Sequence, residues 1–187
     1  MVRSNSILST AEVRVPLVTA SAIEEFARGG YHGTTVADVA RASSISPAYV
    51  FKLFPGKERL FVAALEECFA RIEQALADGA DAAEDQTPDA ILYAMGDAYA
   101  DLIRDRSLLI LQVHAQSVAD IPEVGDALRR GLGRITTFTK SRSGGSDEAV
   151  QRFIAYGQLC HLIVTVRTDD VPEEWARILA LGIRHPE

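Results

Sequence analysis

The sequence predicts an all-α protein in two parts, a three-helix N-terminal domain over residues 1–56 and a helical body over residues 57–187. Two observations predict this fold class. Apolar residues recur at the three- and four-residue spacing of amphipathic helices almost throughout, and no segment shows the alternation typical of a strand. Helix-start signals also recur, at Thr35, at Ser46 before a proline and at Thr87 before another. About nine helices are expected.

The composition is that of an ordinary globular protein. The chain has 187 residues, of which 48% are apolar and 24% charged, enough to bury a core. No apolar run reaches the roughly 18 residues that a membrane span needs, and residues 1–6 contain no signal-peptide core. We therefore expect a cytoplasmic protein with no membrane partner. Cys68 and Cys160 stand alone in apolar stretches, which predicts buried free thiols rather than a disulfide.

Charge is distributed unevenly along the chain. The net charge of −7 argues against a nucleic-acid partner when the chain is taken as a whole. Residues 1–60, however, contain seven Lys and Arg residues against five acids, a net charge of +2, and the remainder contains twelve against twenty-one, a net charge of −9. A slightly basic N-terminal part on an acidic body suits a DNA-binding unit joined to a part that stays off DNA.

The first expected helix has one apolar face and ends at the glycine pair Gly29-Gly30. Pro16 is acceptable at its start, because a first-turn proline loses no hydrogen bond. Residues Ala11–Val15 are then expected to form a separate arm or turn. The apolar face consists of Val18, Ala22, Ile23, Phe26 and Ala27.

Two short helices joined by a four-residue turn are expected next, and their spacing is that of a helix-turn-helix. Thr35 caps the first, with Asp38 three residues on, and Ser46 caps the second, with Pro47 in its first turn. The second ends before the pair at residues 55–56. The inward positions of both helices are apolar, namely Val36, Val39, Ala40, Ile45 and Val50.

The outward face of the second short helix is small, hydrogen-bonding or cationic, so it can enter a DNA major groove without a clash. Tyr49 can reach a base edge or a phosphate, and Lys52 can neutralise a phosphate or read a guanine. The helix starts at Thr35 and Lys57 are suited to bind anions. The alternative is that these are ordinary surface helices of a bundle. The candidate DNA-binding residues are Thr35, Ser46, Pro47, Ala48, Tyr49, Lys52 and Lys57.

The body is expected to consist of further helices over residues 57–77, 87–104, 108–118, 122–140, 147–167 and 172–183. The last two form a hairpin whose apolar faces a single copy can only partly cover. We therefore expect a homodimer that pairs two such hairpins in a four-helix interface. The faces consist of Val150, Phe153, Ile154, Gly157, His161 and Val164, followed by Trp175, Leu179 and Ile183.

From about residue 17 to residue 65 the chain resembles the DNA-binding domain of the tetracycline-repressor (TetR) family. The pattern spans about fifty residues in one fixed register, which makes it much more specific than a short motif. Beyond it the resemblance is one of layout only. The matching segments are Ile23-Glu24-Glu25-Phe26-Ala27, Gly30-Tyr31, Thr34-Thr35-Val36, Val39-Ala40, Ile45-Ser46, Val50-Phe51-Lys52-Leu53-Phe54-Pro55, Lys57-Glu58 and Leu60-Phe61.

The resemblance implies a transcriptional regulator whose third helix reads the major groove and whose body dimerises and binds a small ligand. It implies a repressor released from a palindromic operator by that ligand, with Thr35 and Lys57 on DNA phosphates. The sequence departs from the family at several positions. Ser44 and Ala48 stand where glycine is common. Phe51 and Leu53 stand where tyrosine or histidine is frequent, so the grip on phosphates falls to Tyr49, Lys52 and Lys57.

The middle helices contain more aromatic and soft apolar residues than a compact bundle needs, with a few polar groups among them. Small-molecule pockets are made this way, and so are plain hydrophobic cores. No cofactor and no metal ion are expected. The candidate ligand-binding residues are Phe69, Met95, Tyr99, His114, Phe153 and Tyr156.

Enzyme chemistry has little support in the sequence. His114, Ser117 and Asp120 lie close together, but their spacing on a buried helix is not that of a catalytic triad. No nucleophile-elbow, zinc-protease or phosphate-loop motif occurs. Two rival hypotheses stay open: a DNA-binding protein of the same fold without a ligand switch, and an all-α enzyme or carrier.

Overall fold

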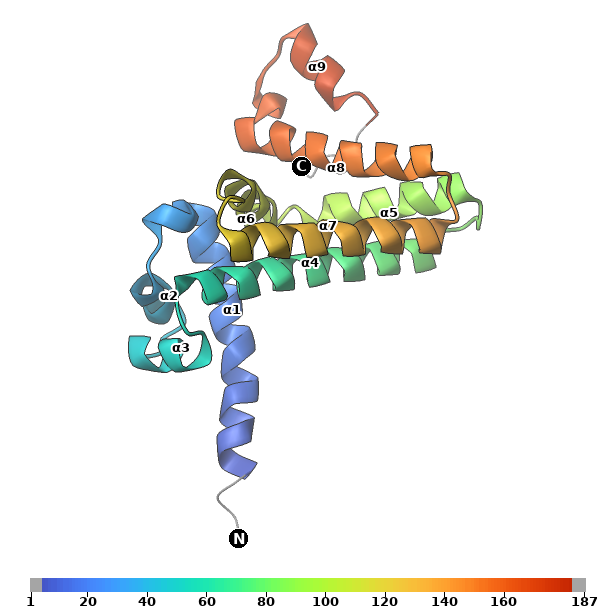
Figure 1. The fold of residues 1–187 in the computed structure, drawn as a ribbon. Helices are drawn as coiled ribbons and strands as arrows, with labels where there is room; N and C mark the ends of the chain where they lie inside the picture. Colours follow the sequence, from blue (N-terminus) through green and yellow to red (C-terminus); the bar gives the residue numbers. More distant parts are fainter. Residues whose placement is uncertain (1–4, 183–187) are drawn as a thin grey trace. The chain divides into compact units, whose positions relative to one another are not determined.

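The computed structural model describes residues 5–182, with side chains from Glu12 onward except that of Asp169. Nine α-helices and one short 3-10 helix follow each other across these residues, which include no strand (Figure 1). The predicted all-α fold class is confirmed. The helices are α1 (Asn5–Gly33), α2 (Val36–Ala42), α3 (Pro47–Leu53), α4 (Lys57–Asp81), α5 (Pro88–Leu102), α6 (Arg106–Ser117), α7 (Pro122–Ser143), α8 (Asp147–Val166), η1 (Thr168–Asp170) and α9 (Glu174–Ala180).

The start of α1 corrects one prediction. Residues Ala11–Val15 are helical and Pro16 lies inside α1 rather than at its first turn, so there is no separate arm. An interior proline removes one backbone hydrogen bond. Here the cost is tolerated because the flanking side chains are exposed, among them Val13 and Leu17, and water can reach the carbonyl that loses its partner.

Helical geometry in α1 stops at Gly30, as the glycine pair predicts. Gly30 has φ 66° and ψ 179°, a conformation that is essentially restricted to glycine. A side chain at Gly29 is excluded as well, since its Cβ would lie 2.5 Å from the hydroxyl oxygen of Thr34. The Thr34 hydroxyl donates to the carbonyl of Glu25 at 3.0 Å, which ties the residues after the break back onto the helix.

The packing of the chain defines two compact units. Unit 1 comprises Met1–Cys68 with Leu111–Leu128, and unit 2 comprises Phe69–Ile110 with Arg129–Glu187. Helices α4, α6 and α7 each contribute residues to both units. The division of function into residues 1–56 and 57–187 stays a prediction.

The core of unit 1 brings three aromatic rings together. Phe26 of α1 and Phe61 of α4 meet edge to face, with ring centres 4.8 Å apart, and Tyr31 packs on Phe61 at 5.2 Å. Helices α1, α2 and α3 of the same unit pack on one another (Figure 1). The aromatic cluster therefore anchors the start of α4 to the end of α1.

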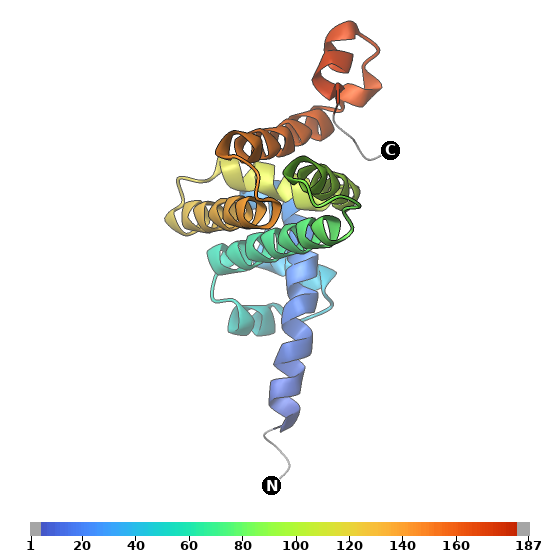
Figure 2. The same cartoon turned by 90° about the vertical axis from the view of Figure 1, so that its right-hand side faces the viewer.

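In unit 2, α5 packs against α8, and the unit 2 part of α4 lies against α7 (Figures 1 and 2). The ring of Phe69 lies directly over Gly131, where no side chain could fit. Cys160 is buried in this unit and Cys68 in unit 1, and both thiols are free, as predicted. Across the described residues, no helix combines the length and apolar character that crossing a membrane requires.

Candidate nucleic-acid interface

The turn between α2 and α3 is built around a left-handed residue. Ser44 has φ 55°, a value that glycine adopts at lower cost. This explains why glycine is common here in the TetR family, which the segment resembles. The Ile45 N–H donates to the carbonyl of Ala40 at 2.9 Å, and the Ser43 hydroxyl donates to that of Val39 at 2.8 Å. The carbonyls at the end of α2 are thereby satisfied.

The inward face of the α2–α3 pair is apolar and closed to solvent. All five positions predicted to face inward are buried, which fixes how the two helices cross. These positions are Val36, Val39, Ala40, Ile45 and Val50.

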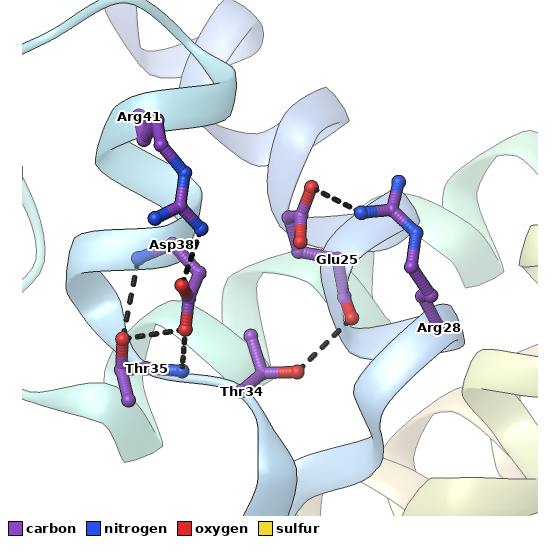
Figure 3. A network of polar contacts seen from close by, with 6 residues as sticks. All are labelled: Glu25, Arg28, Thr34, Thr35, Asp38 and Arg41. Carbon is purple, nitrogen blue, oxygen red and sulfur yellow. Dashed lines mark hydrogen bonds and ion pairs between the residues drawn. The ribbon is translucent and has the colours of Figure 1, made fainter.

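A network of hydrogen bonds closes the start of α2 (Figure 3). One carboxylate oxygen of Asp38 accepts the Thr35 N–H at 2.9 Å and the Thr35 hydroxyl at 2.6 Å. The Asp38 N–H donates back to the Thr35 hydroxyl oxygen at 3.2 Å, which completes the predicted capping box. The Arg41 guanidinium donates to the second carboxylate oxygen at 2.5 Å.

These bonds keep a negative charge at the predicted phosphate contact. Hydrogen bonds from Thr35, followed by the one from Arg41, lower the pKa of Asp38 to about 2, so this carboxylate is charged at neutral pH. The Thr35 hydroxyl is already bonded to it. A phosphate contact by Thr35 therefore has to form beside the Asp38 charge.

The outward face of α3 is open to solvent. Ser46 caps the helix by accepting the Tyr49 N–H at 3.3 Å, Tyr49 itself is half-buried, and Lys52 is exposed. Phe51 is 51% exposed on the same helix, although the sequence reasoning did not include it among the candidates. Its spacing from Ala48, three residues before it, could have indicated a shared face.

Lys57, the first residue of α4, is half-buried. Its ammonium group donates to the carbonyl of Thr34 at 3.3 Å and lies 4.5 Å from the centre of the Tyr31 ring. The Tyr31 hydroxyl donates to a carboxylate oxygen of Glu58 at 2.8 Å. Burial, strengthened by this bond, raises the pKa of Tyr31 to about 12. Lys57 is thus held one residue away from Thr35, the other candidate phosphate contact.

Of the six candidate ligand-binding residues, five belong to unit 2. Phe69 and Met95 are buried, and Tyr156 is 50% exposed. The Tyr99 hydroxyl forms a hydrogen bond with Nε2 of His161 at 3.0 Å. Phe153 is half-buried on α8.

His114, the sixth candidate, belongs to unit 1 and has a structural environment there. Its Nε2 forms a hydrogen bond with the carbonyl of Ala27 at 3.2 Å. A Cβ at Gly30 would lie 3.2 Å from the His114 ring. His114 therefore contacts the end of α1.

An open groove of about 450 Å³ lies along α7 and α8 in unit 2. The Lys140 ammonium group at one end pairs with Asp147 at 2.7 Å and donates to the carbonyl of Gly145 at 2.8 Å. None of the six candidate ligand residues lines this groove. Its lining consists of Thr136, Lys140, Asp147, Val150, Gln151, Ile154 and Ala155. Within the described part of the chain, His, Cys, Asp and Glu side chains form no group of three that could hold a metal ion.

The helix-turn-helix segment matches the sequence pattern of a known protein family. The sequence pattern of the family described as "Bacterial regulatory proteins, tetR family" matches residues 18–64, the segment that contains most of α1, all of α2 and α3 and the start of α4. Among curated proteins, no sequence matches the chain.

Several solved structures share the fold. The transcriptional regulator FadR from Bacillus subtilis, in complex with stearoyl-CoA, has 17% identity and a TM-score of 0.67 over 90% of this chain and 98% of that one. A transcriptional regulator from Pseudomonas aeruginosa has 18% identity and a TM-score of 0.65 over 90% and 87%. A TetR-family regulator from Mesorhizobium loti has 17% identity and a TM-score of 0.61 over 95% and 88%.

The capped, tightly turned α2–α3 pair with its solvent-facing second helix defines a helix-turn-helix protein. Residues 18–64 match the TetR family of bacterial regulatory proteins, and the described chain shares its fold with solved TetR-family regulators. The resemblance drawn from the sequence is confirmed.

Proposed function

We propose that this protein is a cytoplasmic, non-enzymatic repressor that binds a palindromic operator as a homodimer and leaves it when a small molecule binds. The observation that carries the DNA-binding part is the α2–α3 pair. Its crossing is fixed by a buried apolar face and a bonded turn, and the outward side of α3 is left exposed. A rigid pair with an exposed second helix is what reading a major groove requires.

The contacts divide into two groups. Pro47, Ala48 and Tyr49 on α3 face base edges, where small and aromatic side chains discriminate between bases, and Lys52 on the same helix contacts a phosphate. Thr35, Ser46 and Lys57 at helix starts contact the sugar–phosphate backbone and set the register.

Operator binding is tested with the DNA upstream of the protein's own gene, in a gel shift or by fluorescence anisotropy. Lys52→Ala is expected to weaken binding about fivefold. It is also expected to reduce the slope of log affinity against log salt concentration by about one, the value for one lost phosphate contact. Tyr49→Ala is expected to change the preference among operator variants. Arg104→Ala, which removes an exposed cation from unit 2, is the matched control and is expected to bind like the unsubstituted protein. Equal binding of the upstream DNA and unrelated DNA would refute the proposal.

Homodimer formation is supported by the side chains that α8 and α9 leave exposed. Large apolar residues on α8 and α9, and Leu181 directly after α9, are between 50% and 81% exposed in the single chain, and an exposed apolar surface of this kind marks an interaction site. Two copies related by a two-fold axis would cover them. The residues are Tyr156, Leu162, Val166, Trp175, Ile178 and Leu181.

This dimer face differs from the one the sequence pattern indicated. Val150, His161 and Val164 are buried within the single chain, and Ile183 lies outside the described residues. The α8 residues that two copies can share are therefore the exposed ones, Tyr156, Leu162 and Val166, together with the exposed residues of α9.

Ligand release is supported by two observations. The FadR structure from Bacillus subtilis contains stearoyl-CoA, and the structure of the multidrug binding protein EbrR, which shares the fold at a TM-score of 0.58, contains imidazole. In this chain, α4, α6 and α7 each contribute to both units, so a change in unit 2 has continuous helices along which to reach unit 1. Phe69, Met95, Tyr99, Phe153 and Tyr156 stay candidates for the site, as does His114 in unit 1.

A screen of apolar and aromatic compounds tests the ligand switch. Compounds that raise the melting temperature are expected to lower operator affinity, and operator DNA must lower their affinity by the same factor. If stabilising compounds leave operator binding unchanged, the rival without a ligand switch is correct.

A further inference from the structure

Lys52 and Lys57, the two lysines among the candidate DNA-binding residues, differ in how their ammonium groups are held. Lys52 is exposed, and its ammonium group has no hydrogen-bond or ion-pair partner among the residues that the structure describes. Lys57 is half-buried, and its ammonium group contacts both the Thr34 carbonyl and the face of the Tyr31 ring. Of the two lysines, only Lys57 therefore has its ammonium group held in one position before DNA binds.

Tyr31 is itself fixed on three sides. It follows Gly30, whose backbone conformation turns the chain at this point, and it is only 7% exposed. Its ring packs edge to face on Phe61, and its hydroxyl donates to Glu58. Glu58 and Lys57 are neighbours at the start of α4. The first turn of this helix therefore contains both the carboxylate that accepts the Tyr31 hydroxyl and the ammonium group that lies over the Tyr31 ring.

A lysine side chain is flexible, so binding an anion in one place costs conformational entropy. An aromatic face within 6 Å of an ammonium group attracts it and restricts it without neutralising its charge. A carboxylate in the same place would neutralise it. In unit 1 the carboxylate of Glu58 is bound by the Tyr31 hydroxyl, and the Lys57 ammonium lies over the Tyr31 ring.

We propose that Tyr31 is a positioning residue for operator binding: its ring holds the Lys57 ammonium group ready for a DNA phosphate, and its bond to Glu58 holds the ring. This inference rests on the proposed contact between Lys57 and DNA. Tyr31 touches no DNA itself, so it acts only through Lys57.

The proposal is tested by coupling between substitutions in the full chain. Operator affinity is measured for Tyr31→Leu, Lys57→Ala, Lys52→Ala and the two double variants that contain Tyr31→Leu. We expect Tyr31→Leu to weaken binding about three- to fivefold in the unsubstituted protein and in Lys52→Ala. We expect it to have no further effect in Lys57→Ala, where the group it positions is gone.

A purely structural role of Tyr31 would give a different result. Loss of packing would weaken binding by the same factor in both lysine backgrounds, and that additivity would overturn the proposal. Tyr31→Phe keeps the ring and loses only the bond to Glu58, so it is expected to weaken binding less than twofold. If Tyr31→Leu fails to fold, an upfield ring-current shift of the Lys57 ε-methylene signals in the NMR spectrum of the intact protein supports the proposal, and an ordinary shift overturns it.

The same set of proteins separates this inference from the proposed function. If Lys57→Ala binds as well as the unsubstituted protein while Lys52→Ala is weakened, DNA binding stands and the positioning role is overturned. If neither lysine matters and upstream DNA is not preferred over unrelated DNA, the proposed function itself is wrong.

Discussion

The DNA-binding segment of unit 1 and the α8–α9 segment of unit 2 expose opposite kinds of side chain. Along α2 and α3 the inward apolar residues are buried and the outward positions are mostly polar or small apart from Phe51, with capping bonds at both helix starts. Along α8 and α9 the polar side chain of His161 is buried, whereas the large apolar side chains of Leu162, Trp175 and Ile178 are exposed. The first segment covers most of its own apolar side chains, and the second leaves several large apolar side chains open to solvent.

The largest expected effect breaks the proposed interface. Leu162→Glu places a charge in the centre of the exposed apolar face of α8. We expect sedimentation to show a monomer at micromolar concentration and operator affinity to fall more than about a hundredfold, because a monomer reads only one half-site.

Tyr93→Glu is the matched control for this experiment. Tyr93 is 71% exposed on α5 and is not one of the residues of the proposed α8–α9 face, so the same charge there is expected to leave the dimer intact. A protein that is already monomeric without substitution, or a dimer that survives Leu162→Glu, would contradict the proposed interface.

The second expected effect concerns a polar group buried in unit 2. Desolvation lowers the pKa of His161 from 6.5 to about 4, so this side chain is neutral in the folded protein. Below pH 6.5 the unfolded chain takes up a proton that the folded chain does not. The free energy of unfolding should therefore fall by about 3 kcal/mol between pH 6.5 and pH 4 and stay level below that for this group.

Urea unfolding at pH 7, 5.5 and 4.5 measures this effect. His161→Gln is expected to remove most of the decline in that window, since glutamine does not titrate. His32→Gln replaces an exposed histidine of unit 1 and is expected to leave the decline unchanged. A decline that persists in His161→Gln would assign the pH dependence to other groups.

The DNA-binding segment was predictable because its determinants are local. Caps at Thr35 and Ser46 and the stop at Gly30 depend on residues within a few positions of each other, and all three occur as predicted. Pro16 was misplaced because the sequence offers two acceptable readings of a proline near a helix start. Only the exposure of the surrounding turn decides between them.

The proposed dimer face and the candidate ligand residues are harder to predict because they depend on tertiary packing. Helix α8 is apolar on more than one side, so periodicity cannot say whether Val164 or Val166 is covered by the rest of the chain. His114 looks like a pocket residue in sequence, yet its partner is the carbonyl of Ala27, 87 positions away. No local pattern encodes that contact.

A third prediction tests close helix packing in unit 2 with two neighbouring glycines of α7. A Cβ at Gly131 would overlap the ring of Phe69, whereas a Cβ at Gly133 has open space around it. Gly131→Ala is expected to lower the free energy of unfolding by about 2 kcal/mol. Gly133→Ala is expected to raise it by about 0.5–1 kcal/mol, because alanine favours the helix. Equal effects of the two substitutions in denaturant unfolding would show that the Phe69–Gly131 packing is not tight.

The smallest expected effect concerns Asp38 in unit 1. Its substitution should lower the stability of the protein and raise its affinity for DNA. Asp38 caps α2 and carries a charge beside the proposed phosphate contact of Thr35. Asp38→Asn should lower stability slightly, because the bonds from Thr35 and Arg41 lose their charged acceptor. It should raise operator affinity about two- to fivefold at low salt, because a negative charge near DNA is removed and Arg41 is released. Asp89→Asn, at the exposed first turn of α5, is the control and should change neither quantity by a comparable amount. An Asp38→Asn protein that binds operator more weakly than the unsubstituted one would mean that the cap matters for DNA binding through the position of α2, and that the charge of Asp38 does not oppose it.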